Sequence, residues 1–154
     1  MLTTKPMIDV LAIDLDGTLL DPAHKVSQKN IEAVQRARDA GITVLVCTGR
    51  GFGESTHALQ AIDQRDPVMV AGGSIIADPT TGKTLHRFTL SDKVVKAATD
   101  LFHEVECPAL VMKDPSDIGY DYLVLNSDDE HPIHPITQWW FDDHKLRVNY
   151  APHA

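Results

Sequence analysis

Two acidic residues near the start of the chain have a type and spacing that could support phosphate chemistry. Asp14 and Asp16 follow the mostly apolar run Ile8 to Ile13, and Gly17 and Thr18 come next. Carboxylates at this spacing can project toward the same side of a strand end, and Mg²⁺ binds such oxygens together with phosphate oxygens. Gly17 permits a tight backbone departure, and Thr18 adds a hydroxyl for the phosphate. The same residue types also form ordinary turns, so this segment alone leaves both interpretations open.

A second polar segment, Thr48-Gly49-Arg50, follows another apolar run, Ile42 to Cys47. If the two runs are neighbouring parallel strands, their carboxyl ends meet at one edge of the sheet, where ligands bind in such folds. The Thr48 hydroxyl and the Gly49 amide could then hold a phosphoryl oxygen opposite the metal. Taken alone, Thr-Gly is a turn between a strand and a helix. The joint placement of the two segments is what favours a site.

The elements that must position these residues begin with a strand, helix and strand. The apolar runs 8–13 and 42–47 predict two strands, both buried and parallel to each other. Between them, Ser27 is expected to cap a helix that runs through Ala40, with Gly41 at its end. This order predicts a βαβ unit, the building block of a Rossmann-like parallel sheet.

The pattern changes in the second half of the chain, which predicts two parts. A helix is expected over 53–62 and a third strand over 68–71, which extends the α/β part. The further expected elements are a hairpin of strands 74–77 and 84–88, a helix from Ser91, and strands 109–113, 120–125 and 146–150. The helix has one apolar face, built from Val94, Val95, Ala98, Leu101, Phe102 and Val105. We place the boundary in the turn at 79–83, which gives an α/β core over 1–80 and an α+β part over 81–154.

Composition excludes several classes of protein and partner. The 154 residues are 43% hydrophobic and 23% charged, which describes a globular chain rather than a collagen, a coiled coil or a disordered protein. The net charge is −8, and the basic residues form no cluster, so no nucleic-acid partner is expected. Three aspartates interrupt the first apolar stretch, so no membrane segment is expected. With only Cys47 and Cys107 as cysteines, we expect reduced thiols and a cytoplasmic protein.

The two motifs resemble those of a known family. LAIDLDGTLL followed by VLVCTGR is similar to the first two motifs of the haloacid dehalogenase-like hydrolase superfamily, and in particular of its Cof-type phosphatases with an α/β cap. The segment VMVAGGSIIADPTTGKTL resembles the family's third strand and hairpin, although Ala71-Gly72-Gly73-Ser74 stands where Asn-Gly-Ala is usual. Residues 84–150 resemble the first part of the cap in topology.

The resemblance implies a role for each motif residue. Asp14 would be the nucleophile that forms an aspartyl-phosphate, and Asp16 would be the general acid and base. Mg²⁺ would be held by the Asp14 carboxylate and the Asp16 carbonyl. Thr48 and the Gly49 amide would bind the phosphoryl group, and Arg50 would orient the loop or the substrate. The expected function is Mg²⁺-dependent hydrolysis of small phosphorylated metabolites such as sugar phosphates.

Two family elements have no match in the sequence. These are a lysine before a fourth-strand motif and a late Gly-Asp-Gly-x-Asn-Asp segment, so we expect the chain to be truncated within the cap. Three explanations stay open: a piece of a phosphatase, a chain that completes its site with a partner, or a pseudoenzyme. The competing functions are a non-catalytic module that binds phosphate or forms homo-oligomers, and a phosphomutase that uses the same nucleophile.

Other residues that could do chemistry have plainer interpretations. His131 and His134, in an acidic stretch with a proline, are expected in a solvated loop rather than a zinc site. His24 follows Asp21-Pro22, in a segment where the family carries a mobile flap, and is expected to be a surface residue. Cys47 is expected to be a buried, inert thiol. Of the aromatic residues 139–141, one ring is expected to anchor the core.

Overall fold

The computed structural model describes residues 8–128 and 130–152, which fall into two compact units. The first unit ends at Arg87 and the second begins at Phe88. The sequence placed the boundary a few residues earlier, at 79–83. The difference arises because strand β5 (Thr84–Arg87) pairs with strand β4 (Ile75–Ala77) and so stays with the first unit.

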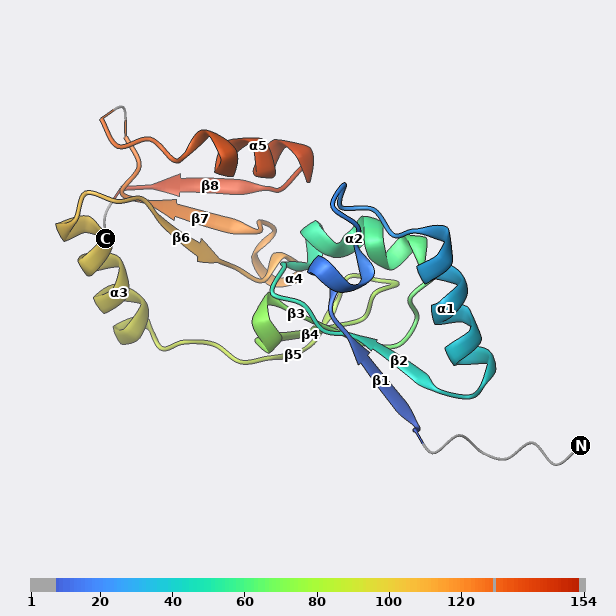
Figure 1. Cartoon of the computed structure of the whole chain (residues 1–154). Coiled ribbons are helices and arrows are strands. Elements are labelled where there is room, and N and C mark those ends of the chain that lie inside the picture. The colour runs from blue at the N-terminus through green and yellow to red at the C-terminus, as the bar shows by residue number, and fades with distance from the viewer. Residues whose placement is uncertain (1–7, 129, 153–154) are drawn as a thin grey trace, which may run out of the picture. The chain divides into compact units, whose positions relative to one another are not determined.

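The first unit combines a parallel pair of strands with an antiparallel sheet (Figure 1). In chain order, its remaining elements are β1 (Val10–Ile13), α1 (Gln28–Asp39), β2 (Thr43–Val46), α2 (Phe52–Ala61) and β3 (Val68–Val70). β1 and β2 are parallel, with Ala12 opposite Leu45, and a parallel bridge between Cys47 and Met69 places β3 next to β2. β3, β4 and β5 pair antiparallel. The expected βαβ unit and hairpin are therefore confirmed.

Helix α1 begins and ends where the sequence predicts. The Ser27 hydroxyl accepts a hydrogen bond from the Asn30 amide at 3.2 Å, which is a capping contact. At the other end, Gly41 has φ +82°, a conformation that glycine adopts without strain. The Asn30 side chain also donates to the Leu19 carbonyl at 2.9 Å. The start of α1 is thereby tied to the loop after β1.

The core of the first unit lies around β2 and β3. Its fully buried members are Leu15, Val44, Val46, Ala58, Val68 and Val70. The predicted burial of the 8–13 strand is wrong, because Val10 is 50% and Leu11 37% exposed. Among the described residues β1 pairs with β2 alone, so one edge and much of its surface face solvent. The run of apolar residues correctly predicted that a strand forms here, but it did not predict which elements cover that strand.

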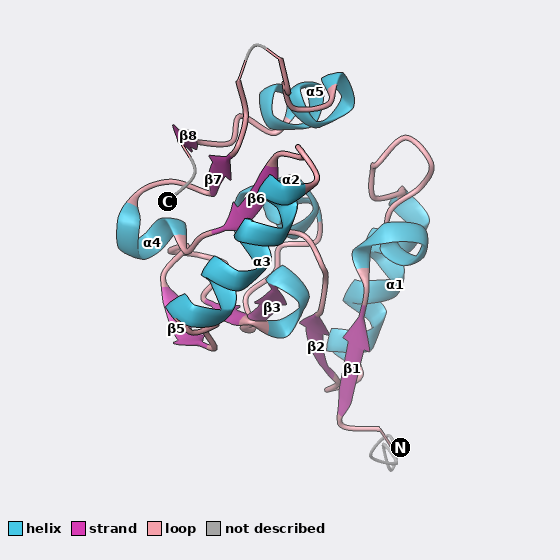
Figure 2. Cartoon of the chain, turned by 90° about the vertical axis from the view of Figure 1, so that its left-hand side faces the viewer, coloured by secondary structure: helices cyan, strands magenta, loops and turns pink. Residues whose placement is uncertain are grey.

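The second unit is a mixed sheet with helices. In chain order its elements are α3 (Asp92–Glu104), β6 (Ala109–Met112), α4 (Pro115–Ile118), β7 (Tyr122–Leu125), α5 (Pro135–Asp143) and β8 (Val148–Ala151). β6 and β7 are antiparallel, and β7 and β8 are parallel. Figure 2 marks the strands in magenta and the helices in cyan. Phe141 on α5 is 3% exposed, and its ring centroid lies 5.2 Å from that of Tyr122 on β7. This contact confirms the expected single aromatic anchor.

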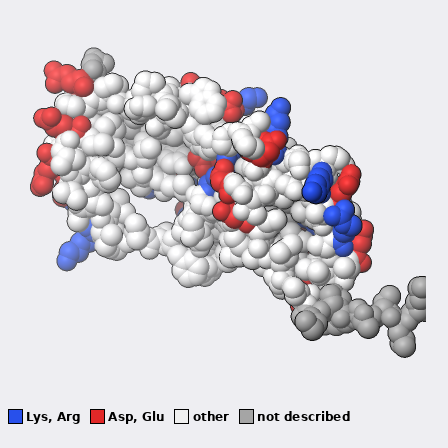
Figure 3. All heavy atoms as spheres, viewed as in Figure 1, with Lys and Arg blue, Asp and Glu red and all other residues white. Residues whose placement is uncertain are grey.

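Helix α3 has the predicted apolar face, but that face is uncovered. Val94, Leu101 and Val105 are 50%, 61% and 63% exposed. The helix is held to its unit at Thr99, which is buried and whose carbonyl accepts from the Asn126 side chain at 3.3 Å. Nowhere in residues 8–128 and 130–152 does a helix have the length and apolarity needed to cross a membrane. On the visible face of the described residues, basic side chains lie singly or in small groups among acidic ones (Figure 3).

Candidate active site

The loop after β1 presents the two acidic residues because its leucines are pinned in the core. Leu15 and Leu19 are at most 1% exposed. The Leu20 amide closes the loop by donating to the Leu15 carbonyl at 2.8 Å. Gly17 turns the chain with φ +68°, a conformation that a side chain at this position would strain. The residues between the two leucines, Asp16, Gly17 and the hydroxyl-bearing Thr18, therefore face solvent.

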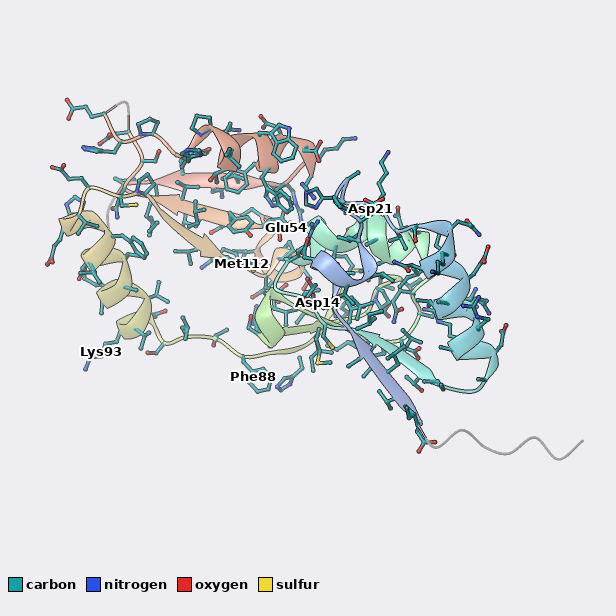
Figure 4. The ribbon with its side chains drawn as sticks, in the orientation of Figure 1. Asp14, Asp21, Glu54, Phe88, Lys93 and Met112 are labelled. Carbon is teal, nitrogen blue, oxygen red and sulfur yellow. The ribbon has the colours of Figure 1, made fainter. Side chains whose placement is uncertain are left out.

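Asp14 lies at the carboxyl end of β1, as Figure 4 shows. Its carboxylate accepts a hydrogen bond from the Leu15 amide at 2.7 Å. Burial, and after it the negative charge of Asp14, raises the pKa of the Cys47 thiol. The parallel register sets Ile13 opposite Val46, so Asp14 and Cys47 both follow the carboxyl ends of neighbouring strands, and the two predicted segments lie at the same edge of the sheet. The raised pKa agrees with the interpretation of Cys47 as an unreactive thiol, since nucleophilic attack needs the thiolate.

Arg50 grips Asp16 with two hydrogen bonds. Arg50 Nε donates to Asp16 Oδ2 at 2.7 Å, and Nη2 donates to Oδ1 at 2.5 Å. The Arg50 side chain is 5% exposed and that of Asp16 is 50% exposed. Such a two-point contact fixes the plane of the carboxylate as well as its position. The sequence placed both residues in the site but did not predict that one holds the other.

Thr48 supports Arg50 from the buried side. Its hydroxyl accepts a hydrogen bond from the Arg50 amide at 3.2 Å, and both residues are 6% exposed. The chain after β3 adds two backbone contacts, from the Ala71 amide to the Arg50 carbonyl at 2.7 Å and from the Gly72 amide to the Thr48 carbonyl at 3.1 Å. Thr48 and Gly49 therefore form a turn between a strand and a helix, which is the plainer interpretation of this segment. The turn follows β2 at the edge of the sheet where Asp14 follows β1.

The start of α2 completes the surroundings of Arg50. The Glu54 carboxylate accepts from the Gly51 amide and caps the helix, and Glu54 is 3% exposed. Arg50 Nη1 lies 3.5 Å from the Glu54 carbonyl. The guanidinium is therefore enclosed by the first turn of α2 on one side and by Asp16 on the other.

His24 is a member of the site that sequence reasoning treated as a surface residue. Its Nδ1 lies 3.0 Å from Arg50 Nη2 and 3.8 Å from Asp16 Oδ1, although its side chain is half exposed. The His57 ring nitrogen Nε2, on α2, lies 3.0 Å from the His24 carbonyl. The one signal in the sequence was the place of His24 just after the Asp-Gly-Thr segment, which does not by itself indicate a contact with Arg50.

The remaining predicted residues have less defined surroundings. A Cβ at Gly49 would meet no atom within 4 Å, so steric crowding does not explain the glycine. Gly49 and Thr18 are both exposed, which leaves the Gly49 amide and the Thr18 hydroxyl at the surface of the unit. Their roles in holding phosphate stay predictions.

The oxygen atoms suited to a divalent cation lie on the first loop. The Asp14 carboxylate and the Asp16 carbonyl are hard donors of the kind that Mg²⁺ takes. The Asp16 carboxylate is engaged by Arg50, so it does not aim at a shared ion in this arrangement. Over residues 8–128 and 130–152, no three His, Cys, Asp or Glu side chains converge in a way that could hold a metal. The described residues thus offer part of a coordination shell.

Comparison with known proteins identifies relatives for most of the chain. The model of the haloacid dehalogenase-like hydrolase family matches residues 11–146. The chain is 45% identical over 83 residues to the 5-amino-6-(5-phospho-D-ribitylamino)uracil phosphatase YwtE of Bacillus subtilis (strain 168), which is 54% of this chain and 28% of that protein. It is 32% identical over 108 residues to an HMP-PP phosphatase of Enterobacter sp. (strain 638), covering 70% and 39% of the two chains. The chain thus spans about a third of the length of these curated relatives.

Solved structures share the fold at lower identity. The HAD subclass IIB sugar phosphatase BT4131 superposes with a TM-score of 0.72 at 17% identity, over 94% of this chain and 53% of that one. A haloacid dehalogenase-like hydrolase from B. subtilis gives a TM-score of 0.68 at 21% identity, over 94% and 54%. These likenesses confirm the predicted class, an α/β Rossmann-like core followed by part of an α+β cap.

Proposed function

The chain belongs to the haloacid dehalogenase-like hydrolase family, and from this premise we propose that it hydrolyses phosphate monoesters of small metabolites. Relatives named as phosphatases of phosphorylated small molecules support this substrate class. The observation that carries the proposal is the meeting of Asp14, Asp16, Thr48 and Arg50 at the carboxyl ends of β1 and β2. In parallel α/β sheets this edge is where ligands bind.

Asp14 is the proposed nucleophile. Its carboxylate is exposed at the end of β1, and the bond from the Leu15 amide fixes one of its oxygens. Attack by the other oxygen on phosphorus forms an aspartyl-phosphate and releases the alcohol, and water then hydrolyses the acyl phosphate. The expected leaving alcohol faces the solvent-exposed side of the loop, where Asp16 lies.

Asp16 is the proposed general acid and base. It would give a proton to the leaving alcohol and later take one from the attacking water. While Arg50 holds both of its oxygens, the carboxylate acts only as an acceptor. Proton delivery therefore requires that one of the two contacts opens, and the Nη2–Oδ1 contact lies on the side of His24.

The phosphoryl group is proposed to lie between the two loops. The Thr48 hydroxyl, the Gly49 amide and the Gly17–Thr18 turn would bind its oxygens. Mg²⁺, held by the Asp14 carboxylate and the Asp16 carbonyl, would neutralise phosphoryl charge and so ease the approach of an anionic nucleophile.

A second candidate is a non-catalytic module that binds phosphate. The engagement of the Asp16 carboxylate by Arg50 favours it, because a carboxylate held in this way orders the loop without donating a proton. The two candidates differ in whether Asp14 becomes phosphorylated.

Hydrolysis of p-nitrophenyl phosphate by this chain, with Mg²⁺ and with EDTA, separates the candidates. The phosphatase predicts Mg²⁺-dependent turnover that falls about 10³-fold or more in Asp14→Asn. The matched control is Asp39→Asn, which removes an exposed carboxylate that accepts from Gln35 on α1. Absence of turnover together with binding of inorganic phosphate, observed by ³¹P NMR, would establish the module instead.

A further inference from the structure

We propose that His24 is a positioning residue, which accepts a hydrogen bond from Arg50 Nη2 and so keeps the guanidinium in the orientation that grips Asp16. The catalytic consequence of this contact rests on the proposed function. The contact itself is a property of the fold and can be tested without turnover.

The hydrogen-bond inventory of the guanidinium is the first argument. A guanidinium has five N–H donors in a rigid plane, two of them on Nη2. One Nη2 donor serves Asp16 Oδ1 at 2.5 Å, and His24 Nδ1 lies at 3.0 Å from the same nitrogen. Nδ1 accepts when the ring proton is on Nε2. Nη2 of Arg50 then donates one hydrogen bond to Asp16 and another to His24.

The second argument is that hydrogen bonds fix the backbone of the loop that carries His24. The Asp21 carboxylate accepts from the Ala23 amide at 2.8 Å and from the Lys25 amide at 2.9 Å. His24 itself has φ +56°, which costs a residue with a side chain free energy and marks a conformation imposed by its surroundings. The backbone bridge between Leu20 and Val26 closes the base of the loop.

The consequence concerns the plane of the Asp16 carboxylate. Without the His24 acceptor, Nη2 loses that partner, and the guanidinium can turn more easily about its Cδ–Nε bond. When the Nη2–Oδ1 contact opens for proton transfer, the Nε–Oδ2 contact alone holds the Asp16 carboxylate, and a turned guanidinium no longer keeps that carboxylate in a fixed plane. Proton delivery to a leaving oxygen then becomes less efficient, since small misplacements lower rates strongly. Attack by Asp14 on phosphorus is not affected by this change.

Two substitutions separate the acceptor from the backbone conformation. His24→Gly removes the acceptor and adopts a positive φ without strain. His24→Asn keeps an acceptor oxygen near the position of Nδ1, and asparagine tolerates the left-handed conformation. The pair therefore differs in the hydrogen bond to Arg50 and shares a relaxed backbone.

The kinetic readout compares two leaving groups. p-Nitrophenolate leaves without a proton, whereas the alkoxide of glycerol phosphate needs one. We expect kcat/KM of His24→Gly to fall about 10-fold more for glycerol phosphate than for p-nitrophenyl phosphate, and His24→Asn to restore most of the difference. The control is His86→Asn on the exposed strand β5, which should leave both rates unchanged. Equal losses on both substrates, or an Asn variant no better than the Gly variant, would overturn the inference.

A second readout needs no activity. The Arg50 side-chain N–H signals in ¹⁵N NMR should exchange with solvent several-fold faster in His24→Gly than in the wild type, with His24→Asn in between. Unchanged exchange would show that His24 does not hold Arg50. If Asp14→Asn leaves hydrolysis unaltered, the proposed function fails, whereas this exchange measurement still decides the role of His24.

Discussion

The two loops of the candidate site differ in burial, and the difference separates reacting groups from supporting groups. Asp14 and Asp16, after β1, are exposed on a loop pinned by buried leucines. Thr48 and Arg50, after β2, are each 6% exposed and bonded to each other. An exposed side chain is free to react with a substrate, while a mostly buried one is held by its neighbours in the position from which it can bind or orient. The β1 loop is therefore suited to chemistry and the β2 loop to orientation.

The largest expected effect is on the rate of hydrolysis, when a proposed reacting group of the exposed β1 loop is replaced. Asp16→Asn removes the proposed acid and should lower the rate of glycerol phosphate hydrolysis about 10²–10⁴-fold. The melting temperature should fall by only a few degrees, because asparagine keeps one oxygen that accepts from the buried Arg50 and the side chain is half exposed. Steady-state kinetics and thermal unfolding of the same samples check both parts. A large loss of stability with an unchanged rate would show that Asp16 supports the fold and does not take part in the chemistry.

The next effect concerns the leucines under the loop. Leu19→Ala should lower the free energy of unfolding by about 2–5 kcal/mol, because it leaves a cavity in a site that is 1% exposed. The matched truncation Val10→Ala, on half-exposed β1, should cost less than about 1 kcal/mol. Urea unfolding of the two variants measures the contrast. Similar costs would mean that β1 is covered in solution.

A smaller effect is expected where α1 meets the loop. Ser27→Ala removes the acceptor for the Asn30 amide and should destabilise the chain by about 1 kcal/mol. The substitution Ser27→Asp keeps a capping acceptor and should retain stability. Denaturant midpoints with unchanged m-values test this pair, and a neutral Ser27→Ala would contradict the capping role.

The smallest effect probes the distance between the two loops. Burial and the charge of Asp14 hold the pKa of Cys47 above its ordinary value, so its alkylation at neutral pH should be slow. Removing that charge in Asp14→Asn lowers the pKa, increases the thiolate fraction and should accelerate alkylation by a few-fold. Iodoacetamide kinetics with Cys107→Ser as background measure the change. An unaltered rate would place Asp14 farther from β2 than the structure does.

Local pattern predicted much of the fold and some of the site. Ser27 and Gly41 marked the ends of α1, and the two apolar runs predicted the parallel pair β1 and β2. The burial of β1 was not predictable in this way, since it depends on which elements cover the strand and not on its own residues.

Contacts between side chains distant in the sequence were the other gap. The grip of Arg50 on Asp16 and the approach of His24 to Arg50 depend on how two loops fold back on each other. Residue type placed Asp16 and Arg50 near one strand edge, but a spacing rule carries no information about their relative orientation. For His24, residue type did not indicate a place in the site, because a lone histidine in a polar turn is commonly a surface residue.

The open edge of β1 has a practical consequence for handling this chain. Val10 and Leu11 stand beside backbone groups that another strand could pair with, and such an edge recruits further copies as protein concentration rises. Light scattering should therefore increase with concentration sooner than for a variant with Val10→Lys. Kinetic measurements are best made on dilute samples, and crystallisation trials should begin from the lysine variant.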